Sequence, residues 1–253
     1  MQEKIKSEGK CLFCGKTFAK AGINKHFDAH FKEIAKSGKS GQSFLLKVEI
    51  PKRWGETPYF LSLWVDGETT LETVDTFLRD IWLECCGHMS AFRLPVKKTS
   101  KKFGVKDFSN SFLVDNDAEY PGEISMSKKA KNVFSRGLEL EYIYDFGSST
   151  QLSITVMNEI PVKADKKIVL LSRNEPVEIV CSVCKQAPAT QICTVCCYDK
   201  DAEYCDKCAK KHEKTCSDFA DYASMPVVNS PRMGVCGYTG GSIDTERDGV
   251  FRM

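Results

Sequence analysis

The feature that most constrains the fold of this chain is a run of cysteine and histidine pairs between residues 181 and 216. The four pairs are Cys181 and Cys184, Cys193 and Cys196, Cys205 and Cys208, and His212 and Cys216. Cysteine sulfurs bind tetrahedral zinc at about 2.3 Å, and two such pairs complete the four-ligand sphere of one ion. The run therefore predicts two zinc ions. Because a closed sphere leaves no position for water, we expect these ions to fold the segment and not to catalyse a reaction.

The order of the pairs predicts an interleaved arrangement of the two ions, known as a cross-brace. The first and third pairs would bind one ion, and the second and fourth pairs would bind the other. The residues after Cys208 predict a short helix, on which His212 and Cys216 would share one face because they are four positions apart. The spacing disfavours the alternative, which is a redox dithiol or a set of disulfides.

This segment resembles the type 1 B-box and related treble-clef zinc modules. The closest match is the sequence YCDKCAKKH at residues 204–212. The resemblance implies a two-zinc module over residues 176–220 that contacts other proteins. The tail that follows, residues 221–253, contains Pro231 and five glycines together with several apolar residues. We therefore expect it to be irregular and to pack on the core.

A second kind of zinc site is predicted near the start of the chain. Cys11 and Cys14 are separated by two residues, and His26 and His30 lie one helical turn apart. The pattern resembles a C2H2 zinc finger over residues 1–37, in which metal holds together a hairpin, a helix and a small apolar core. Eleven residues separate Cys14 from His26, one fewer than in the common finger. Together with the two-zinc module, this site gives an expected content of about three zinc ions per chain.

Two roles are open for the finger: docking or stabilising a protein structure, or contacting nucleic acid. A solvated lysine face is the commoner explanation of its basic residues, but they would also suit phosphate contacts. They are Lys16, Lys20, Lys25 and Lys32. A denser basic run at residues 97–106 holds five lysines and Phe103, a combination that can follow a phosphate backbone with some stacking.

The middle of the chain predicts an α+β domain over residues 43–175, after a polar linker at 38–43. A helix is predicted over 69–86, where apolar residues recur at helical spacing. Strands are predicted where apolar and polar residues alternate. They span 43–50, 59–65, 91–95, 110–115, 138–146, 150–160 and 167–172. The expected fold class is thus α+β, with a central antiparallel sheet and packed helices flanked by two small zinc-binding modules.

The central domain resembles the plasmid pRiA4b ORF-3-like family. One matching element follows the long helix, where the family has His-hydrophobic-x-x-Phe and this chain has His88, Met89 and Phe92. The other is the Tyr-Asp-Phe-Gly turn at residues 144–147. The family usually continues with Asp, Trp and His, where this chain has Ser148, Thr150 and Leu152. The resemblance implies an α+β domain, and the family brings no settled activity with it.

Three neighbouring residues, Cys85, Cys86 and His88, leave several interpretations open. They can be small packed side chains at a helix end, ligands of a further metal with Cys236 or Cys197, or a nucleophilic Cys/His pair. Asp145 favours a turn, although it can also share a polar site with His88. An enzyme would use this region, but no Gly-rich phosphate loop, HExxH pair or GxSxG elbow supports one.

Thirteen cysteines, with no hydrophobic signal region in the opening residues, predict a reducing, cytoplasmic setting with metal-bound thiolates. No apolar run approaches the roughly 18 residues of a membrane span. We therefore expect a non-catalytic binding or adaptor protein. A protein partner is expected first and nucleic acid second, while the oligomeric state stays open.

Overall fold

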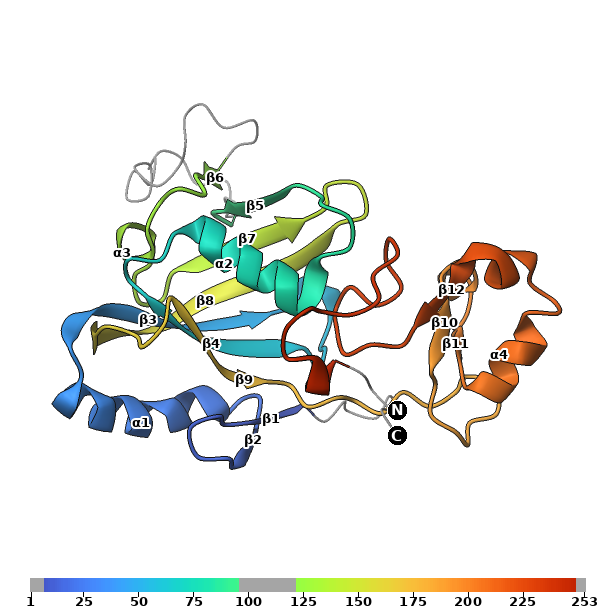
Figure 1. Cartoon of the computed structure of the whole chain (residues 1–253), viewed down its shortest axis with the longest axis horizontal. Helices are drawn as coiled ribbons and strands as arrows, with labels where there is room; N and C mark the ends of the chain where they lie inside the picture. The colour runs from blue at the N-terminus through green and yellow to red at the C-terminus, as the bar shows by residue number, and fades with distance from the viewer. Residues whose placement is uncertain (1–6, 96–121, 249–253) are drawn as a thin grey trace, which may run out of the picture. The chain divides into compact units, whose positions relative to one another are not determined.

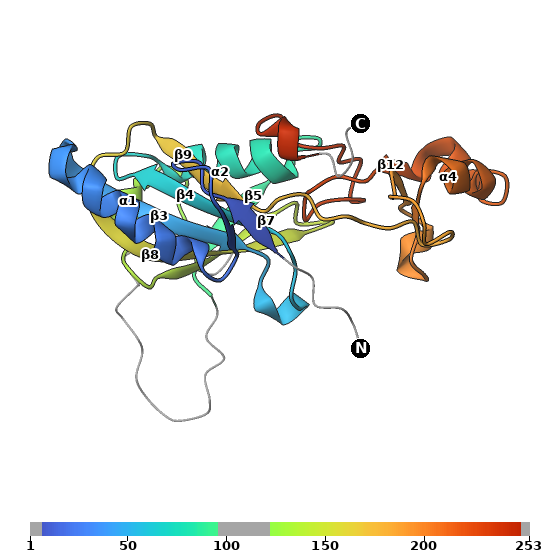
Figure 2. The same ribbon diagram turned by 90° about the horizontal axis from the view of Figure 1, so that it is seen from below.

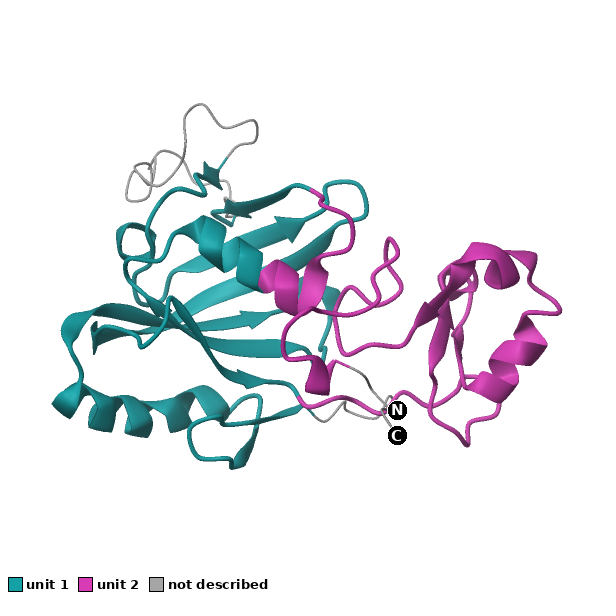
Figure 3. Cartoon of the chain, in the orientation of Figure 1, with its two compact units in different colours: residues 1–77, 89–174 teal, residues 78–88, 175–253 magenta. Residues whose placement is uncertain are grey.

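The computed structural model describes residues 7–95 and 122–248, and the chain divides into two compact units. Figure 3 shows unit 1, residues 1–77 and 89–174, and unit 2, residues 78–88 and 175–253. A short segment from the middle of the sequence therefore belongs with the C-terminal unit. The predicted strand at 110–115 and the basic run at 97–106 lie outside the described residues.

Unit 1 is built on a seven-stranded antiparallel sheet with the order β6-β5-β7-β8-β3-β4-β9 (Figure 1). Its strands are β3 (Ser40–Glu49), β4 (Phe60–Asp66), β5 (Ser90–Arg93), β6 (Glu123–Ile124), β7 (Glu139–Tyr144), β8 (Thr150–Val162) and β9 (Ile168–Arg173). Each hydrogen-bonded pair of neighbours is antiparallel. The predicted α+β class with a central antiparallel sheet is confirmed, and the hairpin of β7 and β8 forms as the sequence indicates.

Helices cover both faces of this sheet, which explains why β4 is buried at nearly every position. Helix α1 (Ile23–Ser37) packs Phe27 and Phe31 in one cluster with Leu45 and Trp64. Helix α2 (Leu71–Leu78) lies on the other face, where the Asp75 carboxylate accepts a 2.6 Å hydrogen bond from the Tyr142 hydroxyl. The two helices run on opposite sides of the strands (Figure 2). The described part of unit 1 also contains the short helical segments η1 (Lys52–Trp54) and α3 (Ala130–Val133).

The first 37 residues share their core with the sheet. Strands β1 (Glu8–Lys10) and β2 (Thr17–Ala19) form a hairpin, and the backbone N–H of Leu12 donates a 2.9 Å hydrogen bond to the carbonyl of Leu171 in β9. Gly9 lies so close to the sheet that an added Cβ would come within 2.6 Å of the Phe60 ring and 2.8 Å of the Arg173 carbonyl. The hairpin is therefore seated directly on the sheet, within the same compact unit.

Unit 2 contains a three-stranded sheet in the order β11-β10-β12. Strand β10 (Gln191–Cys193) lies between β11 (Glu203–Tyr204) and β12 (Ser224–Pro226), and α4 (Asp206–His212) follows β11. The remaining helical segments are the π turns η2 (Arg79–Leu83) and η5 (Phe219–Ala223) and the 3-10 turns η4 (Cys196–Tyr198) and η6 (Thr245–Arg247). Strand β12 comes from the tail that we expected to be irregular, so part of this tail extends the small sheet.

Residues 230–242 of the tail pack against the end of the long helix. The Ser230 hydroxyl donates a 2.7 Å hydrogen bond to the Trp82 carbonyl, and the Ser242 N–H donates one of 2.7 Å to the Asp80 carbonyl. Arg232 and Tyr238, between these two anchors, are fully buried. Among the described helices, none combines the length and apolar character needed to cross a bilayer.

The packing of the N-terminal hairpin on the sheet can be tested by substitution of Gly9. Valine at this position would overlap the Phe60 ring and the Arg173 carbonyl, so we expect Gly9→Val to destabilise unit 1 by about 1–3 kcal/mol. Urea unfolding followed by tryptophan fluorescence measures the change. Gly22→Ala is the control, since the nearest atom to its added Cβ is 3.7 Å away. Equal midpoints for the two variants would contradict the described packing.

Candidate metal centres

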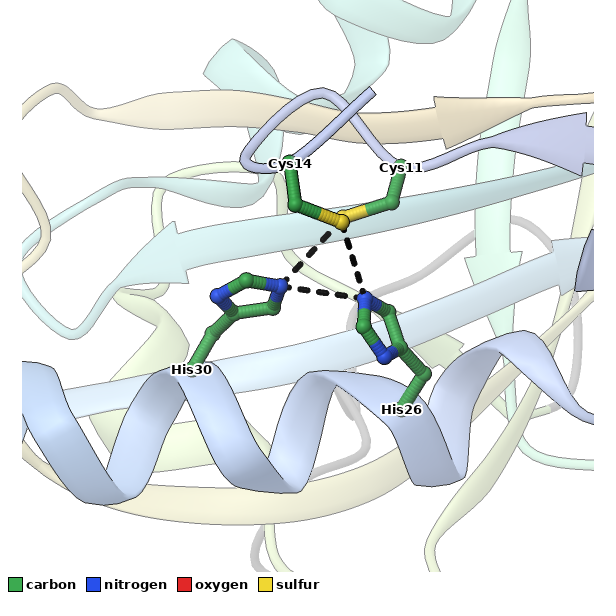
Figure 4. Close-up of side chains that lie close together, drawn as sticks. All are labelled: Cys11, Cys14, His26 and His30. Atoms are coloured by element: carbon green, nitrogen blue, oxygen red, sulfur yellow. Dashed lines mark hydrogen bonds between the residues drawn. The ribbon is translucent and has the colours of Figure 1, made fainter. Parts of the chain in front are cut away.

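The first candidate centre brings together Cys11, Cys14, His26 and His30, whose ligand atoms all lie within 4.8 Å of one another. The cysteines lie in the turn segment between β1 and β2, and the imidazoles reach toward them from one side of α1 (Figure 4). The Nε2 of His26 is 3.3 Å from the Cys14 sulfur, and the Nε2 of His30 is 3.6 Å from the Cys11 sulfur. Tetrahedral zinc bonded at its usual lengths needs ligand separations of about 3.3–3.8 Å, so this donor set fits zinc.

Aromatic side chains fix the orientation of both histidines. The ring of Phe18 stacks on His26 at 4.0 Å between centroids, and the Phe13 ring lies 5.1 Å from that of His30. Burial and the nearby charges of His30 and Lys16 lower the pKa of His26, which favours the neutral, metal-binding imidazole. Burial raises the pKa of the Cys11 thiol, so a cation is needed to hold this sulfur as thiolate.

The second centre joins Cys181, Cys184, Cys205 and Cys208 in unit 2. The Cys184 and Cys205 sulfurs are 3.9 Å apart, close to the edge of a tetrahedral zinc site. Burial alone would raise the pKa of Cys181, but N–H groups at Cys184, Cys205 and Val183 lower it to about 6. Burial and the neighbouring thiols raise the pKa of Cys208 to about 12. A divalent cation would relieve this crowding of like charges.

The third centre joins Cys193, Cys196, His212 and Cys216. The Cys196 sulfur is 3.6 Å from Nε2 of His212, whose ring stacks on Tyr204 at 4.4 Å between centroids. Helix α4 begins before Cys208 and ends at His212, and the N–H of Cys216 then bonds to the His212 carbonyl at 2.9 Å. The grouping of first with third and second with fourth pairs is the interleaved order that the sequence predicts.

A fourth group contains Cys85, Cys86, His88 and Cys236, all in unit 2. Nε2 of His88 lies 3.0 Å from the Cys86 sulfur and 3.2 Å from that of Cys236. Sequence reasoning proposed both Cys236 and Cys197 as partners for the first three residues, and the structure selects Cys236. Cys197 instead donates to the carbonyl of Thr194 at 3.4 Å and belongs to none of the groups found in the described residues.

Asp145 forms a turn in unit 1. Its φ of 64° is in the left-handed region, and one of its carboxylate oxygens accepts hydrogen bonds from the N–H groups of Gly147 at 2.9 Å and Ser148 at 3.1 Å. These contacts are typical of an aspartate that closes a hairpin turn. In the group around His88 the fourth member is Cys236 and not Asp145.

A basic groove runs along α1 and β8 in unit 1, with a volume of about 610 Å³. Five cationic side chains line it against two acidic ones, Asp28 and Glu159. The cations are Lys20, Lys25, Lys32, Lys47 and Arg136. Three of them are lysines that the sequence singled out for phosphate contact. The sequence did not indicate that Lys47 lines this groove, because this lysine is far from the finger in the sequence. The pairing of β3 in the sheet brings it there.

Comparisons with known proteins add little to this description. No family model matches the chain, and no curated protein matches it. One similar solved structure is that of a protein of unknown function from Methanosarcina mazei Go1, with 21% identity and a TM-score of 0.36. The likeness covers 53% of this chain and 68% of that one. A TM-score this low supports no argument about fold or function.

Adjacent cysteines allow a matched test of the third centre. Cys196 belongs to it and Cys197 does not. We expect Cys196→Ala to lose one metal ion and much of the structure around α4, because even the loss of a hydrogen bond to a metal ligand weakens binding about 10–100-fold. Cys197→Ala should keep the full metal content. Metal analysis and circular dichroism measure both effects, and the same metal content in both variants would rule out this ligand set.

Proposed function

We propose that this chain is a non-catalytic, zinc-folded binding protein that works as a cytoplasmic adaptor. The observation that supports this best is the composition of the three predicted centres. Each offers four protein ligands of the cysteine and histidine types that zinc prefers, with spacings that suit a closed tetrahedron. A closed sphere keeps water and substrate off the metal, whereas catalytic zinc keeps one position open. Three zinc ions would thus serve folding.

The alternative, an enzyme with a site around Cys85, Cys86, His88 and Asp145, has weaker support. A nucleophilic cysteine needs a lowered pKa. The hydrogen bond with the Cys85 thiol, together with desolvation and the Cys236 thiol, raises the pKa of Cys86 to about 12. Asp145, the fourth residue of that hypothesis, has the turn-forming contacts described above. A binding role therefore accounts for more of the structure.

A protein partner is the first candidate. The interleaved centres, β10, β11 and α4 support the proposed resemblance to treble-clef and B-box-like modules, and the sheet of unit 1 is compatible with an ORF-3-like domain. Apolar side chains are exposed on the loops that carry zinc ligands, including Val183 at 61% and Tyr198 at 88%. Exposed aromatic and aliphatic side chains beside rigid metal loops are suited to protein contact.

Nucleic acid is the second candidate, and the basic groove favours it. Lys25 and Lys32 are exposed and line the groove from one face of α1. The Glu49 carboxylate partly neutralises the groove, pairing with Lys20 at 3.2 Å and Lys47 at 2.8 Å. The remaining cations are placed to contact phosphates, which would make binding strongly dependent on salt.

Cobalt replacement tests whether the zinc sites are closed. Tetrahedral Co²⁺ bound by thiolates absorbs visible light, and an open site changes its spectrum when azide binds. We expect three or more cobalt ions per chain and a spectrum that azide leaves unchanged. Removing the metal with a chelator should abolish amide protection in α4 and lower it in α1, whose apolar face also packs on the sheet. An azide-sensitive spectrum, or fewer than two bound ions, would contradict the structural role.

The nucleic-acid hypothesis is tested by charge reversal in the groove. We expect Lys25→Glu with Lys32→Glu to weaken binding of a short RNA or DNA duplex and to lower the slope of log affinity against log salt by about two. Lys36→Glu is the matched control, since this residue is on the same helix but pairs with Glu33 away from the groove. Fluorescence anisotropy over a range of salt concentrations measures both. Equal affinities for the reversed and control proteins would remove nucleic acid as the partner.

A further inference from the structure

The group of Cys85, Cys86, His88 and Cys236 has the donors and spacing of a metal site beyond the three that the sequence predicts. The separations between its ligand atoms run from 3.0 Å, between the Cys86 sulfur and Nε2 of His88, to 3.8 Å, between the sulfurs of Cys86 and Cys236. The adjacent sulfurs of Cys85 and Cys86 are 3.5 Å apart, so both point to the same side of the chain. The two sulfur–sulfur separations, 3.5 and 3.8 Å, are close to the edge of about 3.8 Å of a tetrahedral zinc site, and the His88 nitrogen lies slightly nearer to the sulfurs than the edge of about 3.6 Å that zinc sets.

The backbone of the first three residues is arranged to bring them together. Gly87 has a φ of 77°, a conformation that glycine adopts without strain, and it turns the chain between Cys86 and His88. The Glu84 carboxylate fixes this turn, because it accepts a 2.6 Å hydrogen bond from the Gly87 N–H and another of 2.6 Å from Arg79. The π turn of η2 ends directly before this loop.

Cys236 is brought to the same place by the tail. The hydrogen bonds of Ser230 and Ser242 to residues 80–82 anchor the tail on both sides of it. Cys236 itself has a φ of 48°, which is unfavourable for a residue other than glycine and persists only where the surroundings enforce it. A metal bond to its sulfur would supply such a constraint.

The charge of the surroundings suits a thiolate-rich site. Three thiolates and one neutral imidazole around a divalent cation carry a net charge of about −1. The buried guanidinium of Arg232 donates a hydrogen bond to the Cys85 sulfur at 3.4 Å, and its positive charge compensates this excess.

We propose that Cys85, Cys86, His88 and Cys236 bind a fourth zinc ion. Binding would replace the thiol protons, and the ion would join residues 85–88 to a residue nearly 150 positions later in the sequence. None of its four ligand residues is buried, whereas each of the other three centres has at least one buried ligand. The fourth ion should therefore be the first that a chelator removes.

The test compares zinc content in the full-length protein and in Cys236→Gly. Glycine suits the positive φ at this position, so the variant removes the ligand without adding backbone strain. We expect native mass spectrometry of the reduced protein to show four zinc ions, and three in the variant. Cys197→Ala is the matched control, with four. An unchanged zinc content in Cys236→Gly overturns the proposal, whatever the total, and leaves the other three centres unaffected.

A second measurement uses the unaltered protein, so its result does not depend on correct folding of the variant. In the unaltered protein, bound metal should protect Cys86 and Cys236 from iodoacetamide, while the exposed Cys197 reacts. A mild chelator should then make the first two cysteines reactive before any cysteine of the interleaved centres. Reaction of Cys86 and Cys236 at the rate of Cys197 in metal-replete protein would show that no ion is held there.

Discussion

The packing of unit 1 depends on one apolar cluster, which contains residues of both the first candidate metal centre and the sheet. Cys11, Phe27 and Phe31 pack in this cluster with Trp64 and Leu171, so the hairpin that carries two candidate metal ligands and the sheet bury each other. An isolated finger has too few apolar residues to fold without metal. Here the sheet supplies much of the missing core. In return, the hairpin and α1 cover a face of β3 and β4 that is too apolar to be left in water.

The Trp64 indole, which packs in this cluster, is linked by hydrogen bonds to two neighbouring strands. The indole N–H of Trp64 donates a 2.7 Å hydrogen bond to the Ser43 hydroxyl, which in turn donates to the Val162 carbonyl at 2.6 Å. This chain of bonds connects β4, β3 and β8 beneath α1. The position of the first metal centre is thus set by the register of the large sheet as well as by the metal itself.

The features that could be predicted from the sequence are those that depend on residues close together in the chain. The spacing of cysteines and histidines predicted the three four-residue groups, and the apolar alternation predicted the hairpin of β7 and β8. Contacts between distant segments were beyond such patterns: the packing of the hairpin on β9, the choice between Cys236 and Cys197 as the neighbour of Cys86, and the pairing of β12 with β10. Strand β12 has only three residues, SMP, too few for a periodic signal. Local sequence carries no information about which distant surface a short segment meets.

The division of the chain at Leu78 affects how such a protein can change over evolution. Unit 2 is discontinuous, because residues 78–88 belong to it while the chain on both sides of them belongs to unit 1. A gene rearrangement that cut near residue 175 would transfer the two interleaved cysteine and histidine groups but leave Cys85, Cys86 and His88 behind. The C-terminal unit therefore cannot be inherited as a single cassette. The contacts between residues 78–88 and the rest of unit 2 are retained only when the gene segment for the central sheet is inherited as well.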